Sequence, residues 1–224
     1  TLTGWHTGYP DATVRILPQT CREIATEPGN LLFLCEFADK FEETCPRGIL
    51  RRVLKRAEGL GFEVKVGFEY EFFVFAETVF SIREKGYRNL KPISPGFFGY
   101  SMLRNSVLSD WYKDLLAMCE TMDVGIEGLQ TETGAGVLEA AQRVTDGIEA
   151  ADCAALFKLY TKKVNAFGYV LKLLLLPSII IHNKTDKFIR NGTKFTSAHV
   201  HGKKFGKKFS MKKEGEDYKI VRVA

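Results

Sequence analysis

The sequence lacks the long apolar run that a membrane-spanning helix needs. Its longest apolar stretch near the C-terminal end, Leu173 to Ile181, contains Pro177 and Ser178 and is far shorter than the ~20 residues required. The N-terminal residues have neither the charged region nor the apolar region of a secretory signal peptide. These absences predict a protein with no membrane partner and a cytoplasmic location.

Cysteine is scarce and is not arranged for disulfides or zinc. The chain of 224 residues has five cysteines, an odd number, and no Cys-x-x-Cys pair. Disulfide scaffolds and zinc ribbons use paired, closely spaced cysteines, so neither class is favoured. The wide spacing is typical of a reduced cytoplasmic protein.

Several common catalytic and nucleotide-binding motifs are also missing. We find no P-loop, no Gly-x-Gly-x-x-Gly fingerprint, no Gly-x-Ser-x-Gly elbow and no internal repeat. The composition, 45% hydrophobic and 26% charged, is that of a globular protein. Its length suits one large domain or two small ones.

Charge is distributed unevenly along the chain. Residues 1–160 carry 17 Lys and Arg against 23 Asp and Glu, whereas residues 161–224 carry 15 against 4. This change predicts a boundary near residue 160. The basic segment interleaves lysine pairs with Phe205 and Phe209, which is compatible with nucleic-acid binding and with a solvated tail. We expect residues 161–224 to pack less well than the rest and to be cut first by proteases.

Hydrophobic periodicity predicts an α+β fold with a mainly antiparallel sheet. Strands are expected at 12–17, 31–37, 63–75, 126–132 and 137–141, the second of them buried on both faces. Helices are expected at 46–58, 109–122 and 146–164. Ser109 and Asp110 offer N-cap chemistry for the second helix. Residues 133–136 are typical of a hairpin turn, and strands and helices do not alternate regularly.

Two groups of glutamates are candidate metal ligands. A period of two places Glu69 and Glu71 on the same face of the third predicted strand, roughly 6.6 Å apart. Glu132 and Glu139 bracket the Gly-rich turn, so that a hairpin would bring them near each other, and Glu127 precedes them. Gathered carboxylates favour a hard divalent cation such as Mg²⁺ or Mn²⁺. A solvated acidic strand face and ordinary surface glutamates are the competing interpretations.

A third candidate element is the segment Ala198-His199-Val200-His201. If it is a strand, His199 and His201 share one face, and histidine is a common metal ligand. Two surface histidines in a basic tail are the alternative interpretation.

Taken together, these segments resemble glutamine synthetases. The run 67–73 is similar to the Glu-x-Glu-Phe-Phe strand of that family, and 127–139 is similar to the segment with two metal-site glutamates seven residues apart. Residues 45–52 resemble the helix that opens the catalytic domain, and residues 4–18 resemble the later part of the N-terminal β-grasp domain. The order and spacing of these segments hold over residues 1 to about 160.

The resemblance implies an ATP-dependent carboxylate–amine ligase, which joins glutamate to ammonia or a small amine through γ-glutamyl phosphate. The metal ligands it implies are Glu71, Glu132 and Glu139 for one Mg²⁺ or Mn²⁺ ion, and Glu69 with His199 for the other. Glu127 would lie on the nucleotide side. Because active sites of the family lie between subunits, the resemblance also implies a homo-oligomer, and nucleic acid is not an expected partner.

The resemblance also suggests how the chain is divided. Residues 1–44 would be a partial β-grasp-like domain, 45–165 a partial catalytic domain and 166–224 a divergent basic segment. The basic segment lacks the arginine-rich motifs and the last metal glutamate of the family, so we expect this chain to be incomplete and without appreciable glutamine synthesis. A catalytically dead relative with a structural or assembly role is the alternative hypothesis, and a nucleic-acid binder is the third.

Overall fold

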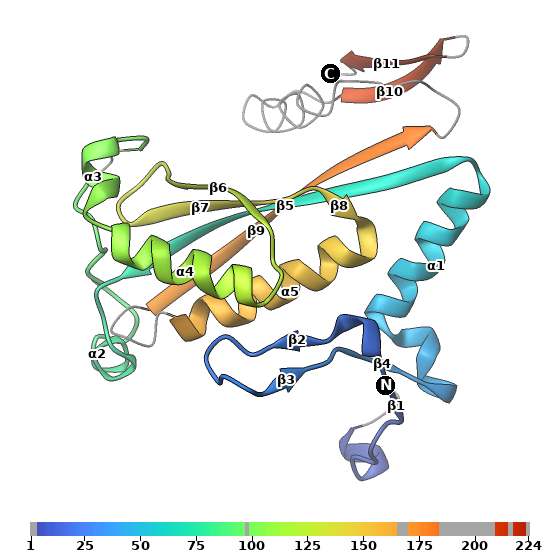
Figure 1. The fold of residues 1–224 in the computed structure, drawn as a ribbon, viewed down its shortest axis with the longest axis horizontal. Coiled ribbons are helices and arrows are strands. Elements are labelled where there is room, and N and C mark those ends of the chain that lie inside the picture. Colours follow the sequence, from blue (N-terminus) through green and yellow to red (C-terminus); the bar gives the residue numbers. More distant parts are fainter. Residues whose placement is uncertain (1–3, 97–98, 165–169, 184–208, 215–216, 223–224) are drawn as a thin grey trace.

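A five-stranded antiparallel sheet forms the centre of the molecule (Figure 1). The computed structural model describes residues 4–96, 99–164, 170–183, 209–214 and 217–222, with side chains up to residue 162. The strands of the sheet are β5 (Phe62–Phe75), β6 (Ile126–Thr131), β7 (Val137–Gln142), β8 (Thr145–Asp146) and β9 (Val170–Asn183).

Strand β5 organises this sheet. β7 and β8 pair with one of its edges, and β6 pairs with the outer edge of β7. β9 pairs with β5 along all 14 of its residues. Every pairing is antiparallel, so the predicted α+β class with an antiparallel sheet is confirmed.

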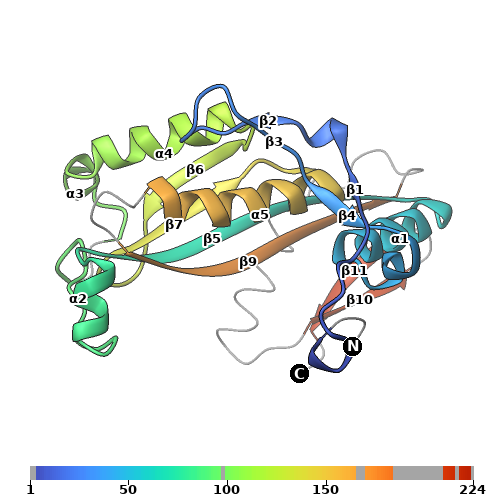
Figure 2. The same cartoon turned by 90° about the horizontal axis from the view of Figure 1, so that it is seen from below.

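The helices of the described chain are α1 (Pro46–Gly59), α2 (Val79–Glu84), α3 (Met102–Ser106), α4 (Ser109–Thr121) and α5 (Gly147–Val164). α4 and α5 lie on the same face of the sheet (Figures 1 and 2). α1 begins at Pro46 as predicted, because proline at the first helical position loses no intrahelical hydrogen bond. The predicted Ser–Asp cap of α4 is wrong. Its N-cap residue is Leu108, which makes no side-chain cap, and Ser109 Oγ donates to the carbonyl oxygen of Ser106 instead, at 2.6 Å.

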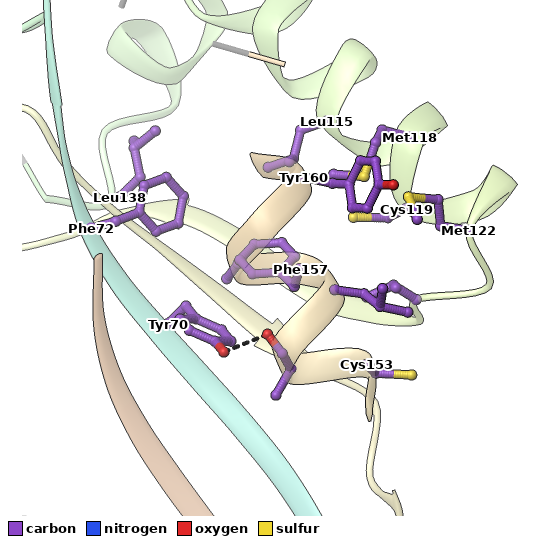
Figure 3. Close-up of a cluster of buried hydrophobic side chains, with 14 of the residues drawn as sticks. Tyr70, Phe72, Leu115, Met118, Cys119, Met122, Leu138, Cys153, Phe157 and Tyr160 are labelled. Atoms are coloured by element: carbon purple, nitrogen blue, oxygen red, sulfur yellow. Dashed lines mark hydrogen bonds between the residues drawn. The ribbon is translucent and has the colours of Figure 1, made fainter. Parts of the chain in front are cut away.

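The hydrophobic core lies between the sheet and the helices α4 and α5. Tyr70, Phe72 and Val74 alternate along β5 and are at most 1% exposed. The ring of Phe157 on α5 lies 5.0 Å from that of Tyr70 and 6.4 Å from that of Phe72 (Figure 3). The buried Tyr70 hydroxyl donates to the carbonyl oxygen of Ala154, at 2.6 Å, and is thereby satisfied. The period of two along β5 therefore gives one face to the core and places Glu69 and Glu71, followed by Phe73 and Phe75, on the other.

The N-terminal residues form two small antiparallel pairs. β1 (Val14–Ile16) pairs with β4 (Cys35–Phe37), and β2 (Arg22–Glu23) pairs with β3 (Leu31–Leu32). Short 3-10 helices lie at Trp5–Thr7, Pro18–Thr20 and Asp39–Thr44. The predicted single strand at 31–37, buried on both faces, is wrong, because the segment divides between β3 and β4 and Leu31 is 59% exposed. The β-grasp domain is not confirmed by this arrangement.

A buried ion-pair network fastens β4 to α1 and α5. The Glu36 carboxylate, 1% exposed, accepts hydrogen bonds from the guanidinium groups of Arg15, Arg47 and Arg51. Arg47 also donates to both carboxylate oxygens of Asp152 on α5, at 2.9 and 3.0 Å. Burial opposes the ionisation of Glu36, but the bonds from Arg47 and Arg51 outweigh it and lower its pKa. The N-terminal strands are thereby tied to the helices beside the sheet.

The basic segment contributes β9 to the sheet and a separate hairpin. β10 (Phe209–Glu214) pairs with β11 (Asp217–Arg222), and neither pairs with any other strand in the described ranges. His199 and the Lys–Phe run up to residue 208 lie outside the described residues, and the packing expected of the segment stays a prediction. None of the helices described has both the length and the apolar character needed to cross a bilayer.

Candidate metal site

The sheet face opposite the core carries a row of polar side chains across three strands. Glu71 on β5 is the cross-strand partner of Glu139 on β7, and Glu139 is the partner of Gln130 on β6. Directly opposed residues in an antiparallel pair share a face, with Cβ atoms about 4.5–5.5 Å apart. Glu69 lies on the same face as Glu71, two residues earlier. Three of the predicted site glutamates therefore project from one small area of the sheet.

Glu132 approaches this row from the turn that follows β6. Its backbone N–H donates to the carbonyl oxygen of Val137, at 2.9 Å, which closes the hairpin. The turn requires glycine at Gly136, where φ is 70° and an added Cβ would lie 2.7 Å from the carbonyl oxygen of Val74. The predicted hairpin is confirmed, and its Gly-rich turn lets the hairpin end pack directly against β5.

The charges of three of these glutamates act on the fourth, Glu139. Burial and, to a smaller extent, the charges of Glu69, Glu132 and Glu71 together raise the pKa of Glu139 to about 7. The hydrogen bond that Gln130 Nε2 donates to Glu139 Oε1, at 3.2 Å, opposes this increase. Like charges gathered at a partly buried site are relieved by a counter-charge, and a divalent cation is one that carboxylates bind.

Tyr100 is a residue of this site that the sequence patterns did not indicate. Its hydroxyl donates to Glu132 Oε1, while Glu132 Oε2 accepts from the backbone N–H of Thr133 at 2.7 Å. The hydrogen bond to Glu132 and the charge of that carboxylate raise the pKa of Tyr100 to about 12, with smaller contributions from burial, Glu139 and Glu71. A tyrosine in a loop has no periodic signal. Gln130, by contrast, would follow from the hairpin register opposite Glu139.

The donor set fits a hard divalent cation in its chemistry. Every proposed donor within the described residues is a carboxylate oxygen, the type that Mg²⁺ and Mn²⁺ prefer. Over the described ranges, however, no three His, Cys, Asp or Glu side chains lie close enough together to hold one metal ion as they stand. The acidic side chains therefore share a face and an electrostatic environment without already forming a coordination shell.

The other two predicted site residues are not placed in this group. Glu127 is exposed at a β-bulge in β6, where the pairing with β7 shifts between Ile126 and Gly128. It is not among the charges that raise the pKa of Glu139. His199 lies outside the described residues, so its role as a ligand stays a prediction.

A cavity of about 130 Å³ adjoins Glu132. Its wall is mainly apolar, with Ile93, Val107 and Val137 among the lining residues, and Arg104 also faces it. It lies where the loop after α2, the helix α3 and the hairpin turn meet. The candidate metal site thus has a concave surface beside it that is large enough for a small organic group.

Known proteins match this chain in sequence and in fold. A model of the glutamine synthetase catalytic domain matches residues 43–173. The chain is 42% identical over 165 residues to type-1 glutamine synthetase 2 of Dictyostelium discoideum, which covers 72% of this chain and 32% of that protein. It is 28% identical over 169 residues to the glutamate–isopropylamine ligase of a Pseudomonas species, which covers 73% of this chain and 36% of that protein.

A solved structure of GmaS without ligand has the same fold over the matching part. The TM-score is 0.63 at 20% sequence identity, and the match covers 74% of this chain and 39% of that chain. The present chain spans about a third of the length of the two relatives matched by sequence.

Proposed function

This chain belongs to the glutamine synthetase family, and from that premise we propose that it is an ATP-dependent carboxylate–amine ligase. The proposed reaction joins glutamate to ammonia or a small amine through γ-glutamyl phosphate. One relative is a glutamine synthetase and another is a glutamate–isopropylamine ligase. The proposal therefore includes both ammonia and a small amine as acceptors. The observation that supports it best is the row of carboxylates around Glu139, whose pKa is raised to about 7.

The proposed metal ligands are Glu69, Glu71, Glu132, Glu139 and His199, for Mg²⁺ or Mn²⁺. Bound cations of this kind would offset phosphate charge and polarise the acyl phosphate. The chain's own neutral groups orient the ligands, because Gln130 donates to Glu139 and the backbone N–H of Thr133 donates to Glu132. We place Glu127 on the nucleotide side of the site.

We also propose a homo-oligomer and a cytoplasmic location, with domains at 1–44, 45–165 and 166–224. For this chain the proposal is narrower than for the family, because residues 166–224 lack the arginine-rich motifs and the last metal glutamate that the resemblance leads us to expect. We propose that it binds ATP with a divalent metal but does not turn over appreciably. Phosphoryl transfer needs several positioned cations, and the loss of one such group commonly costs about 10²–10³ in rate.

The test measures ATP binding and phosphate release by the purified chain, with glutamate and either ammonia or isopropylamine. We expect ATP to bind only when Mn²⁺ or Mg²⁺ is present, with phosphate release close to the uncatalysed rate. Glu71→Gln should weaken the metal-dependent ATP binding, whereas Glu120→Gln, an exposed position on α4, should not.

Two outcomes would contradict this account in different ways. If ATP does not bind under any metal condition, the ligase proposal fails, and a structural role is favoured. Robust phosphate release that is lost in Glu132→Gln would support the ligase and show that this chain is sufficient for turnover.

A further inference from the structure

Both carboxylate oxygens of Glu132 already accept hydrogen bonds within the chain. Oε1 accepts from the hydroxyl of Tyr100, and Oε2 accepts from the backbone N–H of Thr133 at 2.7 Å. Glu132 is therefore held from two sides, once by its own turn and once by a residue of a preceding loop. Of the acidic side chains in the row, it is the one that a loop tyrosine positions.

Tyr100 reaches Glu132 from a strained backbone conformation. Its φ is 64°, in the left-handed region that side chains with a Cβ adopt at a cost of about 1–2 kcal/mol. The residue is 65% exposed, so that little packing holds the ring in place. Its backbone N–H donates to the carbonyl oxygen of Thr131 at the long distance of 3.4 Å. A strained and weakly packed residue of this kind can leave its position at low cost.

We propose that Tyr100 is a latch on the metal site: it holds Glu132 while no cation is bound and releases Glu132 when a divalent ion binds. This inference rests on the metal site of the proposed function. The hydroxyl of Tyr100 uses one lone pair of Glu132 Oε1 and holds the carboxylate toward the loop, so a cation that draws Glu132 toward the other carboxylates must break this hydrogen bond. Tyr100 is a positioning residue in this account and acts only through Glu132.

The latch is consistent with two observations on the acidic row. The charges of Glu69, Glu71 and Glu132 all act on Glu139, which places the four carboxylates in one electrostatic group. Yet across the described part of the chain no three acidic, histidine or cysteine side chains are close enough to share an ion. On this account, release from Tyr100 lets the Glu132 carboxylate join the others around a cation.

The test compares Mn²⁺ binding to the full chain and to Tyr100→Phe by titration calorimetry. Removing the hydroxyl removes the competitor, so we expect Tyr100→Phe to bind Mn²⁺ about tenfold more tightly. Tenfold corresponds to about 1.4 kcal/mol, within the range of one hydrogen bond to a charged group. Tyr100→Ala should change the affinity in the same direction, and both variants should fold, because the side chain is exposed.

Tyr87→Phe is the matched control. Tyr87 is also an exposed tyrosine with positive φ, 61°, and it lies in the turn after α2 rather than beside Glu132. Its substitution should leave Mn²⁺ affinity unchanged. As a second readout, Mn²⁺ should produce a tyrosine ultraviolet difference spectrum in the full chain and in Tyr87→Phe, and not in Tyr100→Phe.

The outcomes separate this inference from the proposed function. Unchanged or weaker Mn²⁺ binding in both Tyr100 variants would overturn the latch and leave the metal site standing. No Mn²⁺ binding to any of these proteins would overturn the latch and the metal site together. Mn²⁺ binding to the Tyr100 variants but not to the unaltered chain would support the latch most strongly.

Discussion

The pKa of Glu139 is set by opposing effects on the acidic face, the face of the sheet that carries Glu69, Glu71 and Glu139. Burial and three neighbouring carboxylates disfavour its charge, and a single amide hydrogen bond from Gln130 favours it. The sum raises its pKa to about 7, so that a substantial share of the side chain is protonated near neutral pH when no cation is present. A cation that binds there must displace this proton, as metal ligands in general must lose theirs.

The raised pKa of Glu139 makes the stability of the metal-free chain depend on pH. Because the folded pKa of about 7 exceeds the ordinary 4.5, the folded state binds more protons than the unfolded state between these values. The stability contributed by this group is therefore fully present below about pH 4.5 and is lost as the pH rises through 7. We expect Glu139→Gln to abolish this loss of stability with rising pH. At pH 8 the free energy of unfolding of the variant should exceed that of the unaltered chain by about 1–2 kcal/mol, after allowance for screening by solvent. Urea unfolding at a series of pH values with a chelator present measures this, and an unchanged pH dependence would contradict the assigned pKa.

Helices and strands with a clear hydrophobic period could be predicted from the sequence, whereas very short ones and a continuously apolar one could not. β5 and the β6–β7 hairpin were predicted because alternation along β5 and the Gly-rich turn are local signals. α2 and α3 have only six and five residues, too few to show a helical period. β9 is a nearly continuous apolar run, and only its backbone pairing with β5 identifies it as a strand.

The attachment of β4 to α1 and α5 also could not be predicted from the sequence patterns, because it depends on one buried carboxylate, that of Glu36. Glu36→Gln should lower the free energy of unfolding by about 3 kcal/mol, since Arg15, Arg47 and Arg51 would lose their shared counter-charge. Glu43→Gln, an exposed position in the same region, should change it by less than about 0.5 kcal/mol. Urea unfolding followed by circular dichroism compares them. Equal, small effects would mean that the network contributes little to stability.

At the scale of the whole molecule, one face of the five-stranded sheet packs against the core and the other carries the candidate metal ligands. Tyr70 and Phe72 project into the core from β5, while Glu69 and Glu71 alternate with them and project from the opposite face. The period of two predicted this division, and the hairpin then brought Glu139 beside Glu71. The position of Tyr100 could not be predicted in this way, because it depends on how a loop packs against the finished sheet.

Mn²⁺ binding to the full chain tests the central claim, that the acidic face is a metal site, most directly. We expect calorimetric titration to give at least tenfold weaker binding for Glu139→Gln than for the unaltered chain, because the variant lacks a ligand oxygen with charge. Glu63→Gln is the control, since Glu63 lies on the same strand and face but pairs with Lys65, roughly 20 Å from Glu69. Unchanged affinity in Glu63→Gln and reduced affinity in Glu139→Gln is the predicted result. Equal Mn²⁺ affinity in all three proteins, or no binding at all, would contradict the claim.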